Sequence, residues 1–145
     1  MISKEASLHT KIYRFVKTVV QSGPKTAVDN TISYLETRVF PQSGCSIGQE
    51  LPTSTKLHHP TGIVIASDAD IGENVDISQN VTIGWKEDGV PTIGDNVRIC
   101  AGAVVIGDIL VDDGAVIGAN AVVLHDVGKN EIVAGVPAEK VGSTN

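Results

Sequence analysis

Aromatic residues and cysteines are scarce in this chain of 145 residues, and long apolar runs are absent. Aromatics make up 3% of the residues although 41% are hydrophobic, so aliphatic side chains and alanine must fill the core, as suits a narrow solenoid. The two cysteines, Cys45 and Cys100, form neither a metal-binding spacing nor a disulfide framework. This pattern is typical of reduced thiols in a cytoplasmic protein. We expect no membrane span, because no stretch has the required length.

A basic surface is absent as well. The formal charge is -6 at pH 7, which argues against non-specific binding to nucleic acid, since such binding needs a positive surface. No block of like charges forms a tail. The length predicts one domain with a small appendage.

A six-residue period runs from Ile65 to Gly128. It fits neither an α-helix, with 3.6 residues per turn, nor a simple strand, with a period of two. It is typical of a parallel β-helix, in which three repeats close one triangular coil and aliphatic side chains stack inward. An ordinary β-sandwich with evenly spaced strands is the alternative. The first position holds Ile65, Ile71, Ile77, Ile83, Ile93, Ile99, Val105, Val111, Ile117 and Val123, and the fifth holds Ala69, Val75, Val81, Val97, Ala103, Ile109, Ala115, Ala121 and Val127.

Two interruptions break this period. Leu57 and Ile65 are eight residues apart, which predicts a bulge over residues 58–62, marked by proline and glycine. The repeat that begins at Ile83 is four residues too long and contains the segment Trp85–Thr92. A long loop on a rigid scaffold is a common place for function, although a tolerated surface insertion explains it equally well.

Residues 1–43 lack the six-residue period and instead carry apolar residues at helical spacing. Two stripes, one from Ile12 to Val20 and one from Val28 to Val39, predict two short amphipathic helices. The sequence therefore predicts an α-helical N-terminal cap over residues 1–43 and an all-β parallel β-helix with a polar tail over residues 44–145.

The chemistry in this sequence is concentrated in His58 and His59. An imidazole is a natural general base for a hydroxyl nucleophile near neutral pH. The other two histidines, His9 and His125, are most simply exposed polar residues. No Gly-x-Ser-x-Gly motif is present, so a serine hydrolase finds little support.

Four segments together resemble the hexapeptide-repeat acyltransferases, in particular the serine acetyltransferase-like branch. Leu57–Ile65 (LHHPTGIVI) is similar to that branch's LDHATGIVI, and Ile77–Gly84 (ISQNVTIG) to its ILQSVTLG. Ile99–Ala103 (ICAGA) resembles its IGAGA, and Ala134–Ala138 (AGVPA) is identical to its AGVPA. The resemblance covers residues 34–142.

The resemblance implies a homotrimer of left-handed β-helices that binds acetyl-CoA as co-substrate in a groove between coils, with no metal. It makes His59 the general base that takes the proton from an acceptor hydroxyl. The acceptor would contact His58, Gln79 and Trp85, and backbone groups of Gly84 and Trp85 would face the oxyanion. The residues implied in coenzyme binding are Gly102, Ala103, Ala121, Ala134 and Lys140.

Departures from the branch bear on the acceptor. Gly44 stands where serine acetyltransferases carry the aspartate that pairs with the base, and the loop at residues 85–92 lacks their second histidine. We therefore expect an O-acetyltransferase acting on a saccharide hydroxyl in surface polysaccharide synthesis, with serine O-acetylation as the alternative. A zinc enzyme like the γ-carbonic anhydrases is more distant, because His58 and His59 are adjacent and their side chains should diverge. A further alternative is a non-catalytic solenoid used for assembly, which would bind no coenzyme A.

Overall fold

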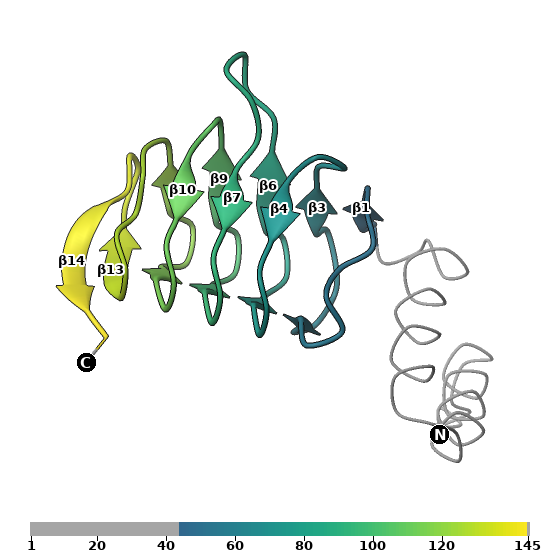
Figure 1. The fold of residues 1–145 in the computed structure, drawn as a ribbon, viewed down its shortest axis with the longest axis horizontal. Coiled ribbons are helices and arrows are strands. Elements are labelled where there is room, and N and C mark those ends of the chain that lie inside the picture. Colours follow the sequence, from purple (N-terminus) through teal and green to yellow (C-terminus); the bar gives the residue numbers. More distant parts are fainter. Residues whose placement is uncertain (1–43, 145) are drawn as a thin grey trace, which may run out of the picture. The chain divides into compact units, whose positions relative to one another are not determined.

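The computed structural model describes residues 44–144, which form a parallel β-helix (Figure 1). The two predicted N-terminal helices lie outside the described residues. Within residues 44–144 there are strands, turns and bends and no helix, as the six-residue period predicts. No described helix is therefore available to cross a membrane.

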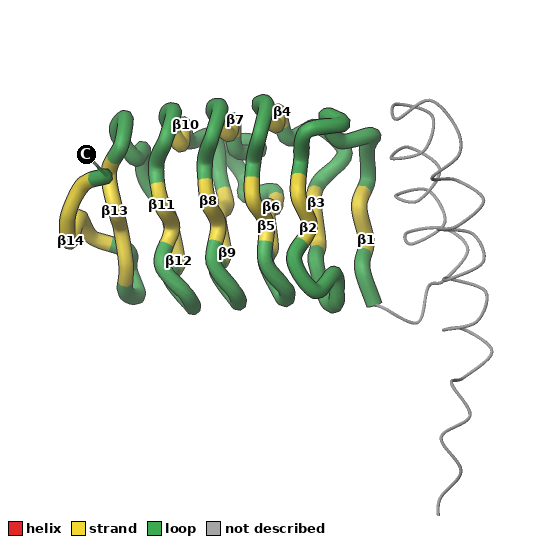
Figure 2. The backbone as a smooth tube through the Cα atoms, turned by 90° about the horizontal axis from the view of Figure 1, so that it is seen from below, coloured by secondary structure: helices red, strands yellow, loops and turns green. Residues whose placement is uncertain are grey.

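Three sheets line the three sides of the coils, and successive coils lie side by side (Figure 2). Sheet A contains β1 (Ser46–Ile47), β3 (Val64–Ile65), β6 (Thr82–Gly84), β9 (Val104–Ile106) and β12 (Val122–Val123). Sheet C contains β4 (Asp70–Ile71), β7 (Thr92–Ile93) and β10 (Leu110–Val111). Sheet B contains β2 (Lys56–Leu57), β5 (Asp76–Ile77), β8 (Arg98–Ile99), β11 (Val116–Ile117), β13 (Glu131–Ala134) and β14 (Glu139–Ser143).

All strand pairs are parallel except that of β13 with β14, a hairpin that follows the last coil. Each strand is short because the chain must turn a corner after every repeat. The chain leaves sheet A for sheet C, then passes to sheet B and returns to sheet A one coil further on. We call the turns that lead from sheet B to sheet A the B–A corner, and those that lead from sheet A to sheet C the A–C corner.

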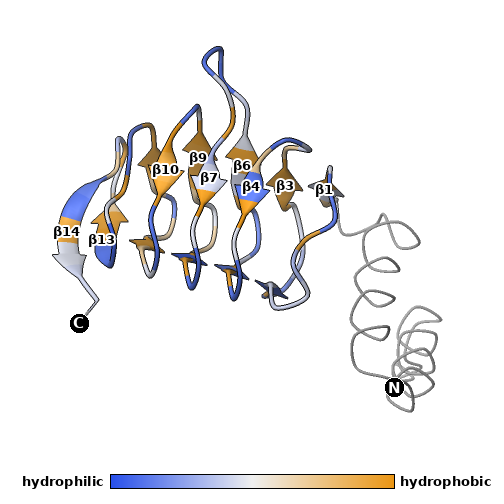
Figure 3. Ribbon diagram, in the orientation of Figure 1, coloured by the Kyte–Doolittle hydropathy of each residue, from blue (hydrophilic) through white to orange (hydrophobic). Residues whose placement is uncertain are grey.

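The core is the stack of inward side chains that the period predicts. Every first-position residue from Ile65 to Val123 is at most 7% exposed, and every fifth-position residue from Ala69 to Val127 at most 8%. No polar or charged residue is buried among the described residues. Figure 3 shows hydrophobic colour recurring on the strands of successive coils, with hydrophilic colour on many of the turns between them. Burying one valine or isoleucine contributes about 1.5–3 kcal/mol, so the column of aliphatic residues supplies the main stabilisation.

The B–A corner is built on residues with positive φ. Gly62, Asn80, Gly102 and Asn120 have φ values of 65, 57, 71 and 56°. Glycine and asparagine are the residues that adopt this left-handed conformation most readily. At Gly102 space is restricted too, because a Cβ atom there would collide with Oδ1 of Asn120 on the next coil. The left-handed conformation and the neighbouring Asn120 side chain together favour glycine at position 102.

Candidate functional site

The bulge that carries His58 and His59 lies at the B–A corner. Leu57 pairs in register with Ile77, and the N–H of His58 donates to the carbonyl of Ile77 at 2.8 Å. The following hydrogen bond between these coils runs from the N–H of Asn80 to the carbonyl of Thr61, at 2.8 Å. Two residues, His59 and Pro60, are therefore extra relative to the next coil. His59 has a φ of 50°, so the chain turns outward there and both histidines are exposed.

The two histidines have different surroundings. His58 Nε2 lies 3.5 Å from Asp76 Oδ1, and the His58 side chain is 53% exposed. Among the described residues, the side chain of His59 makes no hydrogen bond or ion pair. The sequence left open which group orients His59, and none within residues 44–144 does so. His59 is thus an accessible imidazole that an approaching hydroxyl can reach.

Several predicted site residues share this corner. The N–H of Gly102 donates to the carbonyl of Gln79 at 3.0 Å, so these two residues lie on neighbouring coils directly beyond the bulge. The N–H of Val122 donates to the carbonyl of Gly135 at 3.0 Å, which brings Ala134–Gly135 to the far end of the row. The corner therefore aligns the bulge, Gln79, Gly102 and the start of the AGVPA segment along one edge.

Ala103 and Ala121 belong to this row, but their side chains point into the core. Both are 0% exposed, because they occupy the inward fifth position of their repeats. Only their backbone can face a ligand, and a large side chain at either position would fill core space instead of a groove. The role in coenzyme binding that the resemblance implies for these two residues stays a prediction, in which only their backbone atoms could take part.

Gly84 and Trp85 lie where the strands of sheet A end, on the side of the sheet opposite the B–A corner. Gly84 ends β6 and Trp85 begins the loop to β7, so both are at the A–C corner, whereas His59 precedes β3 at the B–A corner. The loop closes as a small hairpin through hydrogen bonds between Lys86 and Gly89 and projects beyond the other turns (Figure 1). Trp85 is 67% exposed. One chain therefore does not bring Trp85 and His59 together.

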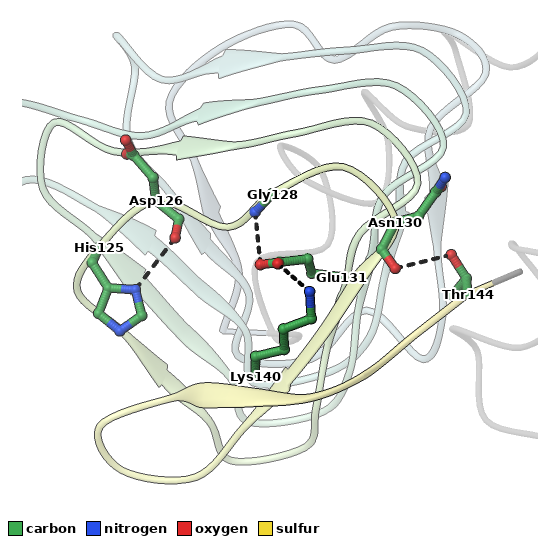
Figure 4. Close-up of polar contacts among 7 residues, drawn as sticks. All are labelled: His125, Asp126, Gly128, Asn130, Glu131, Lys140 and Thr144. Atoms are coloured by element: carbon green, nitrogen blue, oxygen red, sulfur yellow. Dashed lines mark hydrogen bonds and ion pairs between the residues drawn. The ribbon is translucent and has the colours of Figure 1, made fainter.

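Lys140 lies on the terminal hairpin and is engaged in an ion pair (Figure 4). Its Nζ donates to Glu131 Oε1 at 2.6 Å, and the other carboxylate oxygen of Glu131 accepts from the N–H of Gly128 at 3.0 Å. The hydrogen bonds from Lys140 and then from Gly128 hold the pKa of Glu131 below its ordinary value of 4.5. A coenzyme phosphate that binds Lys140 would have to compete with the carboxylate of Glu131.

Sequence reasoning missed a charged cluster beside the bulge. Asp76 lies within 3.9 Å of Lys56 Nζ and 3.8 Å of Arg98 Nε, in addition to His58. The repeat indicated this cluster, because Lys56, Asp76 and Arg98 each directly precede an inward aliphatic residue and so occupy equivalent outward positions. Within residues 44–144, no three histidine, cysteine, aspartate or glutamate side chains are grouped closely enough to hold a metal ion.

Comparison with known proteins bears on this arrangement. Residues 91–125 match the family described as bacterial transferase hexapeptide (six repeats). The chain is 36% identical over 148 residues to a serine acetyltransferase of Staphylococcus aureus strain Mu50, and the match covers 97% of this chain and 68% of that protein. The chain belongs to the serine acetyltransferase-like branch of the hexapeptide-repeat acyltransferases. Both the family and the branch that the sequence motifs resembled are confirmed.

Solved structures of the branch agree with the fold. A serine acetyltransferase from Brucella abortus strain S19, in complex with coenzyme A, superposes with a TM-score of 0.68 at 32% identity, covering 93% of this chain and 55% of that one. Soybean serine acetyltransferase complexed with serine gives a TM-score of 0.56 at 36% identity, covering 65% and 43%. This acyltransferase chain thus spans about half the length of these solved relatives.

Proposed function

We propose that this chain transfers the acetyl group of acetyl-CoA to the side-chain hydroxyl of L-serine. The observation that carries the proposal is the 36% identity with a serine acetyltransferase along 97% of the chain, which includes the histidine bulge. A relative solved with coenzyme A and another solved with serine support the same two substrates. A cytoplasmic location, expected from the sequence, is part of the proposal.

His59 is the general base in this proposal. Its neutral imidazole takes the proton from the serine hydroxyl as the oxygen attacks the thioester carbon. The tetrahedral intermediate then collapses, the C–S bond breaks, and the imidazolium returns the proton to the departing sulfur. The exposure of His59 and its lack of a polar partner among the described residues support this role, because the ring is free to meet the substrate.

Coenzyme A lies along the B–A corner in this proposal, from the bulge toward Ala134–Gly135. Neighbouring coils are about 4.8 Å apart, so this row is roughly 19 Å long. Backbone groups near Gly102 would face the pantetheine arm. Lys140 would exchange Glu131 for a phosphate of the coenzyme, which is chemically reasonable because a lysine binds either group as a point charge.

The site is completed by a second copy of the chain. His59 and Trp85 flank sheet A at opposite ends, and the outer face of that sheet is largely apolar. Its outward residues in register are Ser46, Val64, Thr82, Val104 and Val122. If such faces pack around a threefold axis, the B–A corner of one copy meets the A–C corner of the next. A homotrimer would then place the Gly84–Trp85 backbone opposite a neighbour's His59 and its thioester.

A saccharide acceptor is the second candidate, favoured by residues that depart from the branch. Gly44 and His58 replace two carboxylates implied by the family resemblance, and the loop at 85–92 has no histidine. The comparisons favour serine over the saccharide acceptor that these departures led us to expect, since the relatives reported above are serine acetyltransferases.

Two experiments test the proposal. The first measures coenzyme A release by purified full-length protein with L-serine, free sugars and nucleotide sugars. Release with L-serine is expected, and release with a sugar alone would transfer the proposal to the second candidate.

The second experiment tests the shared site by mixing two inactive variants, His59→Ala and a chain whose loop 85–91 is replaced by a two-residue turn. Mixed trimers contain some interfaces with an intact bulge and an intact loop, so activity should reappear. Mixed trimers without activity, formed from variants that each fold, would contradict a site between copies.

A further inference from the structure

A column of charged side chains runs along the outer face of sheet B, next to the histidine bulge. Lys56, Asp76 and Arg98 are paired in register on β2, β5 and β8. Each directly precedes an inward aliphatic residue and therefore points outward, because successive side chains of a strand alternate between the two faces. Arg98 is the only arginine within residues 44–144.

Asp76 is the covered centre of this column. Its side chain is 22% exposed, whereas those of Lys56, Arg98 and His58 are 66%, 64% and 53% exposed. The distances from its carboxylate to the three nitrogens are 3.9, 3.8 and 3.5 Å, and its Oδ1 atom makes no hydrogen bond. The three nitrogen-bearing groups thus surround the carboxylate at ion-pair distances but form no short hydrogen bonds with it.

The charges in the column do not cancel. One carboxylate compensates one of the two permanent cations, which leaves a surplus positive charge beside the bulge on a chain whose formal charge is -6. An arginine guanidinium matches a carboxylate with two parallel hydrogen bonds, and lysine adds a point charge. This local surplus fits a small anionic group beside His58, the residue that directly precedes His59 in the bulge.

We infer that Arg98 and Lys56, held by Asp76, bind the α-carboxylate of an amino-acid acceptor whose hydroxyl lies at His59. This inference rests on the proposed function and deepens it, because it supplies a site for a carboxylate in a chain whose loop at 85–92 lacks the second histidine of the serine acetyltransferases. Asp76 is a positioning residue here: it draws the two cations to the edge of the bulge.

A purely structural reading is that the column is a cross-strand charge ladder, which stabilises neighbouring strands. The two readings differ in what a substitution changes. A ladder affects the stability of the fold and treats all acceptors alike. A carboxylate site affects only acceptors that carry a carboxylate.

The test compares L-serine with L-serinamide, which keeps the hydroxyl and the amino group but lacks the carboxylate. Arg98→Gln should raise the KM for L-serine about 10- to 100-fold, the range for losing a hydrogen bond between charged groups, and leave the KM for L-serinamide within about threefold. Lys56→Gln should act in the same direction with a smaller effect. Lys129→Gln is the matched control, since Lys129 pairs with Asp113 at 3.2 Å on another corner and should change neither KM.

Each outcome decides a different point. An unchanged KM for L-serine in a folded, active Arg98→Gln protein would overturn the carboxylate site alone. Equal effects on L-serine and L-serinamide would favour the charge ladder and also overturn it. If the wild-type protein acetylates neither compound, the proposed function fails, and this site fails with it.

Discussion

Replacing Gly102 by alanine tests how the B–A corner is built. Gly102 has a φ of 71°, where an L-residue is strained by about 1–2 kcal/mol. A Cβ atom would also collide with Oδ1 of Asn120, and because this oxygen is the end of an exposed side chain that can turn aside, the collision adds about 0.5–1.5 kcal/mol, the cost of displacing a side-chain torsion. We therefore expect Gly102→Ala to lower the free energy of unfolding by about 1.5–3.5 kcal/mol, the sum of the two costs.

The chain offers a control for each cost. Gly44 has nearly the same φ, 64°, and no atom of the described residues lies within 4 Å of a Cβ placed there. Gly44→Ala should therefore show only the cost of about 1–2 kcal/mol for the left-handed conformation. Replacing Asn120 by glycine removes the obstacle, so Gly102→Ala in that background should cost about as little as Gly44→Ala.

Urea unfolding at one fixed protein concentration measures these differences, because the apparent stability of an oligomer depends on concentration. A favourable coupling of about 0.5–1.5 kcal/mol between Gly102→Ala and Asn120→Gly is expected from the double-mutant cycle. Equal losses in Gly102→Ala and Gly44→Ala, with no coupling to Asn120, would refute the reasoning.

Three further predictions concern the base, the core and the terminal hairpin. His59→Ala should reduce turnover about 10²–10⁴-fold with little change in acetyl-CoA affinity, whereas His58→Ala should mainly raise the KM of the acceptor; the reverse result in steady-state kinetics would reassign the base. Ile99→Asp, at a position that is 0% exposed, should prevent folding, so a soluble trimer in size-exclusion chromatography would contradict the proposed register. Because the pKa of Glu131 is lowered, its pairing with Lys140 stabilises the fold above pH 4.5 and is lost as pH falls through the lower folded value; Glu131→Gln should flatten this part of the pH–stability curve, and an unchanged curve would exclude the pairing as its cause.

The repeat itself was sufficient to predict the fold and the core. Stacking identical short units leaves little freedom, so the phase from Ile65 to Val123 determines which side chains point inward. The same repeat predicts that the side chains of Ala103 and Ala121 point inward, because every fifth-position residue is buried. Their predicted role in coenzyme binding comes from the family resemblance and does not depend on the direction of their side chains, because it involves the backbone.

Contacts between coils were harder to predict. Asp76 is separated by 20 residues from Lys56 and by 22 from Arg98, and they meet only because the bulge at 58–62 and the insertion at 85–92 both preserve the register of sheet B. The pairing of Glu131 with Lys140 arises in an antiparallel hairpin, which a six-residue period does not predict. His59 precedes a strand of sheet A and Trp85 follows one, so the two lie on opposite sides of the sheet. Predicting this separation likewise requires knowing the order in which the chain passes through the three sheets.

Acetylation of L-serine is the reaction proposed for this chain. The most direct measurement incubates the purified full-length chain with acetyl-CoA and L-serine and quantifies both O-acetyl-L-serine and released coenzyme A. We expect the two products in equal amounts, with a kcat/KM for L-serine above that for any free or nucleotide-linked sugar. Absence of O-acetyl-L-serine, together with acetylation of a sugar by the same preparation, would contradict the claim.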